Sequence, residues 1–512
     1  MDYAWCVTGS YYTLLARRFA EHAARTAIET DGGRRLTFAE LDAESARMAS
    51  CLAQLGARVG DRVAAQVERS PEALCLHLAC LRAGFVYVPV NPALTDAELE
   101  YHVTDAAPRI VVLDPSRKAP PGEAERLTLD ASGNGTLRER SRAVPPRFET
   151  RACTTDDLAL LLYTSGTTGK PKGAMLTHGN LASNVRSLCE LWRFTADDVL
   201  LHTLPLSHVH GLVVALGCAW LSAATIRLLA RFDAKEIVRQ LASATVFMGV
   251  PTHYARLLAE PALDRAACSS MRLFVSGSAP LTAAAFTEFQ VRTGHRILER
   301  YGMTETVMIA SNPYDGERVP GSVGFTLPDV SLRVVDSDGR AVAVGEPGVL
   351  EVHGPNVCKG YWNAAEKTTG AFRSDGWFIT GDVGRIDASD RVWLEGRASD
   401  LVITGGYNVY PREIEDALLE VAGVSDAAVF GVPHPEWGEA VVAALCVRES
   451  AVDELAVMSA LRSRLAAYKI PKRVVLLDAL PRNAMGKVQK HALRAEYTML
   501  FIDGGRGWGS RG

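Results

Sequence analysis

The sequence predicts an α/β protein. We expect a large N-terminal domain of mixed and parallel sheets with helices, ending in a β-rich subdomain, and then a small, mobile C-terminal α+β domain. Strand-like and helical segments alternate through the first part of the chain, which is typical of parallel α/β packing. Short strands broken by Gly, Pro and Asp begin near residue 320, and a third pattern begins near residue 398. The predicted domains are 1–397, with its β-rich part at 320–397, and 398–500, followed by a tail at 501–512.

The N-terminal elements follow from capping and periodicity. Thr37 and Glu40 have the spacing of a capping box, in which both side chains satisfy free backbone N–H groups at a helix start. That helix carries Leu41, Met48 and Leu52 on one face. A helix is expected at 71–82, and apolar strands are expected at 62–67, 85–90, 110–113, 158–163, 245–248 and 273–275.

The C-terminal elements are shorter. Pro411 can occupy the first turn of a helix that places Ile414, Leu418 and Val421 on one face. The other expected elements are strands at 427–432, 441–447 and 474–477 and a helix at 455–465. Together they make a compact α+β domain. The Gly-rich tail is expected to be disordered.

Composition excludes several classes of protein. The net charge of −4 leaves no chain-wide basic field for nucleic acid or an anionic membrane. The ten cysteines form no C-x-x-C pair and lie mostly in apolar context, so we expect reduced core residues. No secretory signal is evident at the N-terminus, and the uncharged run 211–226 is shorter than the roughly 20 residues of a bilayer span, which favours a buried helix. We therefore expect a cytoplasmic monomer or homodimer without a membrane span.

The segment 158–173, LALLLYTSGTTGKPKG, is a buried-type strand that runs into a loop of Gly, Ser, Thr and Lys. Such a loop offers backbone N–H groups, hydroxyls and a cation to an oligophosphate, and we expect the following helix to be capped near Thr177 or His178. The spacing is not that of a Walker A loop, because the inner glycines are too close and a proline follows the lysine. A mobile hydrophilic linker is the alternative interpretation.

Further motifs follow this loop in order: YGMTET at 301–306, GWFITGD at 376–382, GR at 396–397 with DLVITGGYN at 400–408, and PRNAMGK at 481–487. With YTSGTTGKPKG, they make the chain resemble the adenylate-forming superfamily of acyl-CoA synthetases, adenylation domains and luciferases over nearly its whole length. The resemblance implies a reaction in two halves. A carboxylate attacks the α-phosphate of ATP to give an acyl-adenylate and pyrophosphate, and the thiol of coenzyme A then displaces AMP.

The resemblance also implies roles for the matched residues. Lys487 is expected to bridge the substrate carboxylate and the α-phosphate, which offsets the repulsion between two anions. Thr304 would offer its hydroxyl to the α-phosphate, and Glu305 would hold Mg²⁺ together with phosphate oxygens. Tyr301 should stack on adenine. Asp382 would accept both ribose hydroxyls.

The remaining nucleotide contacts are expected from the phosphate loop and from turns around the base. Arg397 should reach ribose or phosphate. The other expected ATP-binding residues are Thr164, Ser165, Gly166, Thr167, Thr168, Gly169, Lys172, Gly277, Ser278, Ala279, Glu299, Gly302 and Met303. ATP and Mg²⁺ are thus the expected cofactors, and coenzyme A is the expected co-substrate.

In this superfamily the small domain rotates between the half-reactions. The resemblance implies that Lys487 withdraws while Gly405 and Gly406 approach the pantetheine tunnel of coenzyme A. The pivot falls at Ser399, where many relatives carry Asp or Lys. Serine can still absorb a change in φ and ψ, so we expect Ser399 to act as the hinge.

Arg300 is informative about the acid, because superfamily members usually carry a small or polar residue at this place. A buried unpaired guanidinium costs several kcal/mol, which favours a substrate with a second carboxylate. A charge-assisted pair with that carboxylate would contribute about 1.5–3 kcal/mol. The alternative is a structural ion pair of Arg300 with Glu299 or another acid.

The stretches 248–252, 299–300 and 311–318 closely resemble the malonyl-CoA synthetases of the superfamily. That resemblance implies a substrate-carboxylate site made by Arg300, with His208 beside the reactive carboxylate or at the entry of the thiol. Ser278 would add a hydroxyl to the distal carboxylate. A core histidine without a chemical role is the alternative for His208, and His210 is the weaker candidate of the two.

The sequence therefore predicts an acid–thiol ligase that converts malonate and coenzyme A to malonyl-CoA, AMP and pyrophosphate at the expense of ATP, with methylmalonate as a further candidate substrate. Two alternatives stay open. One is an acyl-CoA synthetase for another short-chain or aromatic acid, and the other is a non-catalytic nucleotide-binding homologue. The expected partners are malonate, ATP and coenzyme A.

Overall fold

The computed structural model of the chain describes residues 9–118, 120–164, 171–405, 407–447, 454–462, 464–483 and 486–501. The chain divides into two compact units: unit 1 comprises 1–332 and 352–378, and unit 2 comprises 333–351 and 379–512. The predicted α/β class is confirmed. The predicted boundary after residue 397 stays a prediction, and most of the predicted disordered tail lies outside the described residues.

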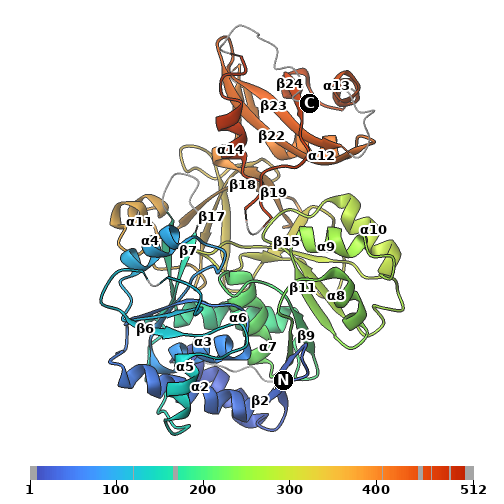
Figure 1. Cartoon of the computed structure of the whole chain (residues 1–512). Coiled ribbons are helices and arrows are strands. Elements are labelled where there is room, and N and C mark those ends of the chain that lie inside the picture. Colours follow the sequence, from blue (N-terminus) through green and yellow to red (C-terminus); the bar gives the residue numbers. More distant parts are fainter. Residues whose placement is uncertain are drawn as a thin grey trace. The chain divides into compact units, whose positions relative to one another are not determined.

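Unit 1 contains two sheets (Figure 1). The first has the spatial order β6 (Glu125–Thr128), β5 (Ile110–Leu113), β3 (Arg62–Gln66), β4 (Val86–Pro89), β7 (Leu158–Thr164) and β8 (Lys172–Thr177). The second has the order β2 (Arg35–Thr37), β1 (Thr26–Thr30), β10 (Thr225–Leu228), β9 (Val199–His202), β11 (Val246–Gly249), β12 (Leu273–Ser276), β13 (Leu298–Tyr301), β14 (Ala310–Ser311) and β15 (Ser322–Thr326). Neighbours from β1 to β13 pair in parallel, so their carboxyl ends meet at one edge.

Helices separate these two sheets and cover their outer faces. The main apolar core joins both sheets to α1 (Tyr11–Glu21), α2 (Phe38–Gln54), α3 (Pro71–Ala83), α6 (His178–Leu191), the π-helix η1 (His210–Ala215) and α7 (Leu216–Leu221). A second core packs α8 (Ala234–Leu241), α9 (Pro251–Leu258) and α10 (Ala283–Thr293) on the far side of the second sheet (Figure 1). A third core packs α4 (Asp96–Ala106) on the first sheet. Two short helices complete unit 1: α5 (Thr136–Arg142) and α11 (Ala365–Ala371).

Neighbouring residues of one strand enter different cores. Leu200 of β9 belongs to the main core, whereas Leu201 belongs to the core of α8 to α10. This follows from the strand period of two, which points successive side chains to opposite faces. Each central strand of the second sheet is therefore apolar on both faces. Its carboxyl end is then the first position at which polar side chains can be presented to a ligand.

The predicted capping box is confirmed. The Thr37 hydroxyl accepts from Glu40 N, and Glu40 Oε2 accepts from Thr37 N at 2.7 Å, so α2 begins where expected. Leu41, Met48 and Leu52 are buried, as predicted. The uncharged run 211–226 begins as a buried helix, as expected, and ends in β10.

The helix after the phosphate loop is confirmed in part. Thr177 caps α6, which begins at His178. However, β8 lies between the loop and this helix and pairs antiparallel with β7. The phosphate-loop segment therefore connects two antiparallel strands and does not lead directly into α6.

Unit 2 begins with the strands of the predicted β-rich part and ends with the predicted α+β domain. The first strands are β16 (Ser331–Val335), β17 (Gly348–His353), β18 (Phe378–Ile386) and β19 (Val392–Arg397), hydrogen-bonded in that order. A short 3-10 helix, η2 (Ala398–Asp400), follows β19.

The C-terminal sheet has the order β21 (Tyr407–Val409), β20 (Val402–Thr404), β23 (Gly438–Val447) and β22 (Val424–His434), and β24 (Arg473–Leu476) pairs with β23. The helices α12 (Pro411–Leu419) and α13 (Glu454–Arg462) pack on one face, and α14 (Lys490–Glu496) packs on the other. Ile414 and Leu418 are buried, as predicted, whereas Val421 is half-buried.

The cysteine prediction is confirmed for the part of the chain that the structure describes. The nine cysteines described there are buried and free of disulfides. Among these same residues, no helix is long and apolar enough to cross a lipid bilayer. Neither finding tests the expected cytoplasmic location, which stays a prediction.

Candidate active site

The phosphate loop connects β7 to β8. These strands pair so that Thr164 and Lys172 face each other at the base of the loop, and both are half-buried. The other predicted loop residues lie outside the described residues: Ser165, Gly166, Thr167, Thr168 and Gly169. Their contacts with phosphates stay predictions.

Tyr361 links Lys172 to the predicted magnesium ligand. The Nζ atom of Lys172 lies 5.0 Å from the centre of the Tyr361 ring, and the Tyr361 hydroxyl donates to Glu305 Oε1 at 2.9 Å. The structure thus brings the base of the phosphate loop close to Glu305. Tyr361 is absent from the residues predicted from sequence, because one aromatic residue in a turn is more typical of core packing.

Glu305 has the properties of a single-carboxylate magnesium ligand. It is 5% exposed, and it forms no ion pair with any residue that the structure describes. Mg²⁺ commonly takes one or two carboxylates and completes its shell with phosphate oxygens and water. The donor set therefore fits Mg²⁺ bound together with a nucleotide. Within the described ranges, no cluster of three or more His, Cys, Asp or Glu could hold a metal by itself.

The turn after β13 carries Gly302, Met303 and Thr304, which are half-buried and precede Glu305. Tyr301 ends β13 and is 6% exposed. The turn after β12 carries Gly277, Ser278 and Ala279. Because β12 and β13 are parallel neighbours, both turns lie at the same edge of the sheet, where open α/β sheets bind ligands.

Arg300 is buried without an acid. Its side chain is 4% exposed, and Nε and Nη2 have no hydrogen-bond partner among the described residues. Burial lowers the pKa of this guanidinium to about 9, although Tyr254 opposes the shift. Glu299, the preceding residue, accepts from Gly321 N at 3.2 Å through Oε1. Successive strand residues point to opposite faces, so the alternative of a Glu299–Arg300 ion pair is wrong.

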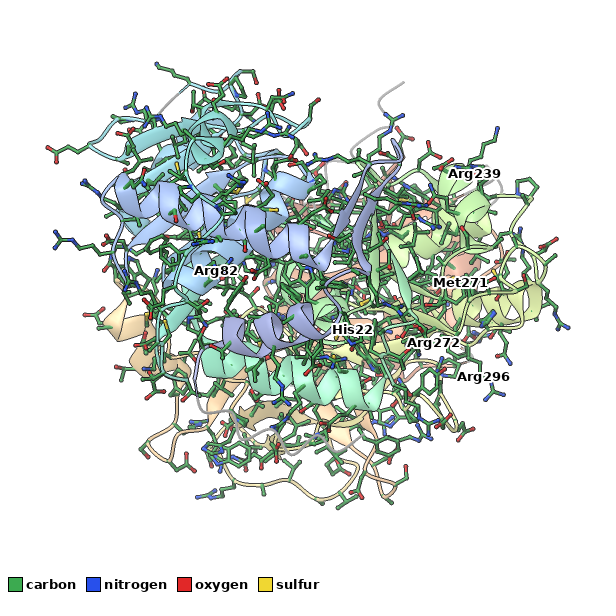
Figure 2. All side chains as sticks on the ribbon, turned by 90° about the horizontal axis from the view of Figure 1, so that it is seen from below. His22, Arg82, Arg239, Met271, Arg272 and Arg296 are labelled. Atoms are coloured by element: carbon green, nitrogen blue, oxygen red, sulfur yellow. The ribbon has the colours of Figure 1, made fainter. Side chains whose placement is uncertain are left out.

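Two other arginines of unit 1, Arg82 and Arg272, have paired guanidinium groups, and both are labelled in Figure 2. Arg82 is buried, and Arg272 is half-buried. Arg272 binds Asp198 through Nε and Nη2, both at 2.6 Å. Arg82 donates to Ser45 Oγ at 2.8 Å and lies 3.3 Å from Asp42 Oδ1. Buried charges in proteins are normally paired in this way. Among the described residues, Arg300 departs from that rule.

Gly277 makes room for the Arg300 guanidinium. A Cβ atom at residue 277 would lie 2.3 Å from Arg300 Cζ, so the guanidinium packs directly against the backbone there. The next residue, Ser278, has φ of 70° although it is not glycine. Such left-handed backbone costs about 1–3 kcal/mol and is concentrated at functional sites. The 277–278 turn thus leaves the space that the Arg300 guanidinium occupies.

Two histidines lie at the start of η1, and His210 is close enough to Arg300 to feel its charge. His208 is half-buried, and its carbonyl accepts from Leu212 N at 2.9 Å, just before the π-helix η1. Isolated π-helical turns often occur at functional sites. His210 begins η1, and its Nδ1 lies 3.4 Å from Ser278 Oγ. Burial and the Arg300 charge hold the pKa of His210 well below its usual value.

Unit 2 carries the predicted ribose ligands. Asp382 and Arg397 are cross-strand partners on β18 and β19, and Asp382 Oδ1 lies 2.7 Å from Arg397 Nε. Arg397 Nη1 also donates to Thr380 O at 3.1 Å. A positioned guanidinium keeps the Asp382 carboxylate oriented as a hydrogen-bond acceptor. The sequence placed both residues at the nucleotide but did not predict that they contact each other.

Lys487 closes a turn in unit 2. Its backbone N donates to Asn483 Oδ1 at 3.0 Å, and its carbonyl accepts from Asn483 N at 2.9 Å, while the side chain is exposed. Gly486, with φ of 74°, provides the left-handed residue before it. The NxxGK spacing thus has a local structural reason: Asn and Gly form the turn that presents the lysine.

The predicted hinge and coenzyme A residues also lie in unit 2. The Ser399 carbonyl accepts from Arg494 Nη1 at 2.9 Å, and Arg494 Nη2 pairs with Asp400 Oδ1 at 3.0 Å. Gly405 has φ of 56°, and its N donates to Trp437 O at 2.9 Å. Gly406 lies outside the described residues.

Comparison with known proteins identifies the class. The AMP-binding enzyme family matches residues 15–362, and the AMP-binding enzyme C-terminal domain matches 413–487. The chain therefore belongs to the AMP-binding enzymes, the adenylate-forming superfamily that its motifs resemble.

Particular relatives are close over their whole length. The ATP-bound crystal structure of MatB from Rhodopseudomonas palustris is 49% identical with a TM-score of 0.93, covering 96% of this chain and 99% of that one. The mitochondrial malonate–CoA ligase ACSF3 of Mus musculus is 36% identical, covering 89% of this chain and 86% of the relative. The indoleacetate–CoA ligase of Aromatoleum aromaticum is 37% identical, covering 90% and 93%.

The unpaired state of Arg300 makes a prediction about stability. Replacing a buried charge by a hydrophobic residue of similar size is often stabilising by about 1–4 kcal/mol, so Arg300→Met should unfold at higher urea concentration at pH 7. The Arg300 pKa is lowered on folding, so the cost of its charge is fully present below pH 9. That cost falls as pH rises above 9, and the difference between variant and wild type should narrow. A variant that is less stable by several kcal/mol at pH 7 would show that a protein acid pairs with Arg300.

A second prediction concerns Gly277. Gly277→Ala should push the guanidinium from its place and lower kcat/KM for malonate, the acid predicted from the sequence, by at least about 10-fold, the worth of one charged hydrogen bond. The φ of Gly277 is not left-handed, so the backbone itself tolerates alanine. Gly370→Ala, where an added Cβ meets nothing within 4 Å, is the matched control. Steady-state kinetics with unchanged malonate turnover in Gly277→Ala would contradict this packing argument.

Proposed function

We propose that this protein is an ATP-dependent malonate–CoA ligase that forms malonyl-CoA, AMP and pyrophosphate through malonyl-adenylate, with methylmalonate as a further substrate. Family membership supports the adenylate chemistry. The observation that carries the choice of acid is the buried Arg300 guanidinium, whose Nε and Nη2 find no partner among the described residues. Relatives from Mus musculus, Arabidopsis thaliana and Homo sapiens that are named malonate–CoA ligases support the same acid.

The energetics favour a dicarboxylate over a monocarboxylate. A monoacid would leave the Arg300 charge desolvated and unpaired, as it is in the free protein. A second carboxylate supplies a charge-assisted and bidentate partner, worth about 1.5–3 kcal/mol. The desolvation cost of the Arg300 charge is already present in the folded free protein, so pairing with a second carboxylate makes the free energy of substrate binding more favourable. In malonate, one methylene separates the two carboxylates, so one can be activated while Arg300 holds the other.

Adenylation requires two anions to meet. Lys487 would bridge the attacking carboxylate and the α-phosphate, while Thr304 donates its hydroxyl to the phosphate, so that the developing charge is offset and the reacting atoms are aligned. Asp382, oriented by Arg397, would accept from the ribose hydroxyls. Tyr301 would stack on adenine. Mg²⁺ held by Glu305 would neutralise phosphate charge when it is bound with ATP.

Further nucleotide contacts are proposed from the residues around these groups. The phosphate-loop residues with Lys172 would hold the β- and γ-phosphates through N–H groups, hydroxyls and one ammonium. The residues proposed around adenine and its pocket are Gly277, Ser278, Ala279, Glu299, Gly302 and Met303. His208 would lie beside the reactive carboxylate, and Ser278 would act on the second carboxylate through His210.

Thioester formation is proposed to follow a rotation about Ser399. Arg494 contacts both the Ser399 carbonyl and the Asp400 carboxylate, so it holds the hinge segment in one backbone conformation. Rotation would change the φ and ψ angles of Ser399 and bring Gly405 and Gly406 to the pantetheine of coenzyme A. We accordingly propose 1–397 and 398–500 as the functional domains. A cytoplasmic location and a monomeric or homodimeric state are likewise proposals.

Another CoA ligase substrate is the second candidate function. The relatives include proteins named indoleacetate–CoA ligase and feruloyl-CoA synthase at similar identity, so overall similarity alone does not select the acid. The residues at the acyl pocket must select it. An aromatic acid would place an apolar ring against the buried cationic group of Arg300, which would leave that charge unpaired.

The first functional prediction is substrate preference. With ATP, Mg²⁺, coenzyme A and a mixture of mono- and dicarboxylic acids, mass spectrometry should identify malonyl-CoA as the main thioester. Arg300→Ala should lower kcat/KM for malonate by at least roughly 100-fold, since a buried charge partner is lost. Arg239→Ala, on the exposed side of α8, is the matched control. A dominant aromatic or fatty acyl-CoA would favour the second candidate function, and the absence of any thioester or adenylate would favour a non-catalytic homologue.

The second functional prediction separates the half-reactions. Lys487→Ala should lower malonate-dependent pyrophosphate release by about 10²–10³-fold, the range for loss of one preorganised electrostatic group. Formation of malonyl-CoA from supplied malonyl-adenylate should change by less than about 5-fold, because Lys487 acts only before that step. Lys490→Ala, which removes a lysine paired with Glu415, is the control. Equal loss in both assays would contradict the proposed role.

A further inference from the structure

His210 lies where the start of η1 meets the turn after β12, close to Arg300 on β13. It begins η1 and is 1% exposed. Its Nδ1 lies 3.4 Å from Ser278 Oγ, in the turn whose preceding residue, Gly277, carries the Arg300 guanidinium. The Arg300 charge is also the strongest electrostatic influence on this imidazole after burial. His210 and Arg300 are therefore neighbours in the interior of unit 1, on either side of the 277–278 turn.

The contact with Ser278 determines which nitrogen of His210 carries the proton. A neutral imidazole has one donor and one acceptor. If the Ser278 hydroxyl donates to Nδ1, the hydrogen must be on Nε2, as the partner of one ring nitrogen fixes the tautomer. The Nε2 atom is buried and has no hydrogen-bond partner in the described part of the chain. In that tautomer, Nε2–H is a buried donor without a partner among the described residues.

The surroundings keep His210 neutral. The charged and titratable groups that act on it are Arg300 from β13, His202 from β9, His253 from α9 and His208 from the segment before η1. Each of them lowers its pKa. His202 is buried and His253 is half-buried, and burial lowers the pKa of each to about 3. His210 is consequently a hydrogen-bond donor without charge at neutral pH.

Three buried polar atoms without partners among the described residues now point to one ligand. They are Arg300 Nε and Nη2, from the carboxyl end of β13, and His210 Nε2, from the start of η1. Unsatisfied buried donors cost about 1–3 kcal/mol each and are rare in native proteins. A carboxylate offers about four lone-pair sites, which matches this set of donors.

We propose that His210 is a specificity-determining residue, which donates its Nε2–H to the second carboxylate of the substrate beside Arg300, while Ser278 acts as a positioning residue that fixes the tautomer. This inference rests on the proposed malonate–CoA ligase function and deepens it. Arg300 supplies charge for the second carboxylate, and His210 supplies a directional neutral donor. The pair rejects a monoacid because both residues would then stay unsatisfied.

The test uses the full-length protein and two substitutions at residue 210. His210→Gln keeps a donor at the reach of Nε2, whereas His210→Leu removes it. The readout is the ratio of kcat/KM for malonate to kcat/KM for propanoate, a monoacid of similar size, in a pyrophosphate-release assay. His210→Leu should lower this ratio by about 10–100-fold, as expected for one hydrogen bond to a charged group, and His210→Gln should stay within about 3-fold.

Two controls separate specificity from folding. His77→Gln replaces another fully buried histidine with a low pKa, on α3 against Trp220, and should leave the ratio unchanged. The KM for ATP should change by less than about 3-fold in every variant, because His210 faces the acid and not the nucleotide. Equal losses for malonate and propanoate in His210→Leu would show a structural role and overturn the inference.

The pH profile gives a second readout. Since His210 is neutral, the malonate kcat/KM of wild type and His210→Leu should run parallel between pH 6 and 9. A wild-type advantage that grows as pH falls through this range would mean that His210 acts as a cation, which contradicts the proposal. Wild-type protein that forms no malonyl-CoA would overturn the proposed function and this inference together. Wild-type malonyl-CoA synthesis with an unchanged ratio in His210→Leu would overturn this inference alone.

Discussion

A positive charge buried without a protein partner is the constraint on which the site depends. The Arg300 guanidinium is 4% exposed, and burial lowers its pKa to about 9. Folding gains nothing from such a group, since stability would favour a hydrophobic side chain or an adjacent acid. The desolvation cost of this charge is offset only when a ligand supplies an anion, which makes ligands with such an anion bind more tightly. Stability and specificity are therefore opposed at this residue, as they often are at active sites.

The fold explains how a guanidinium can be buried at this place. Parallel strands of the second sheet of unit 1 are apolar on both faces, so their carboxyl ends can present polar groups to a ligand. There, Gly277 leaves room for the guanidinium and Ser278 adopts left-handed backbone to reach His210. The phosphate loop belongs to the other sheet and is tied to Glu305 through Tyr361. Unit 2 separately prepares its own groups, with Asp382 oriented by Arg397 and Lys487 presented on a turn.

Much of the fold could be predicted because its signals are local. The capping box at Thr37, the apolar strands and the helix at Pro411 depend on residues close in sequence. The strand β8 was not predicted, because only a short segment separates the phosphate loop from the cap of α6. Its antiparallel pairing with β7 makes this segment a strand. At the site, the sequence identified Arg300 but left open an ion pair with Glu299, which the opposite directions of neighbouring strand residues exclude.

Other features of the site depend on tertiary contacts that no motif encodes. The closeness of Tyr361 to Lys172, of Arg494 to Ser399 and of His210 to Ser278 joins segments distant in sequence. The most direct measurement of the central claim is a crystal structure with bound malonyl-adenylate. We expect an oxygen of the second carboxylate within about 3 Å of Arg300 Nη2, the distance of a charge-assisted hydrogen bond. A carboxylate turned toward solvent, or a guanidinium paired with an acid of the protein, would contradict the account.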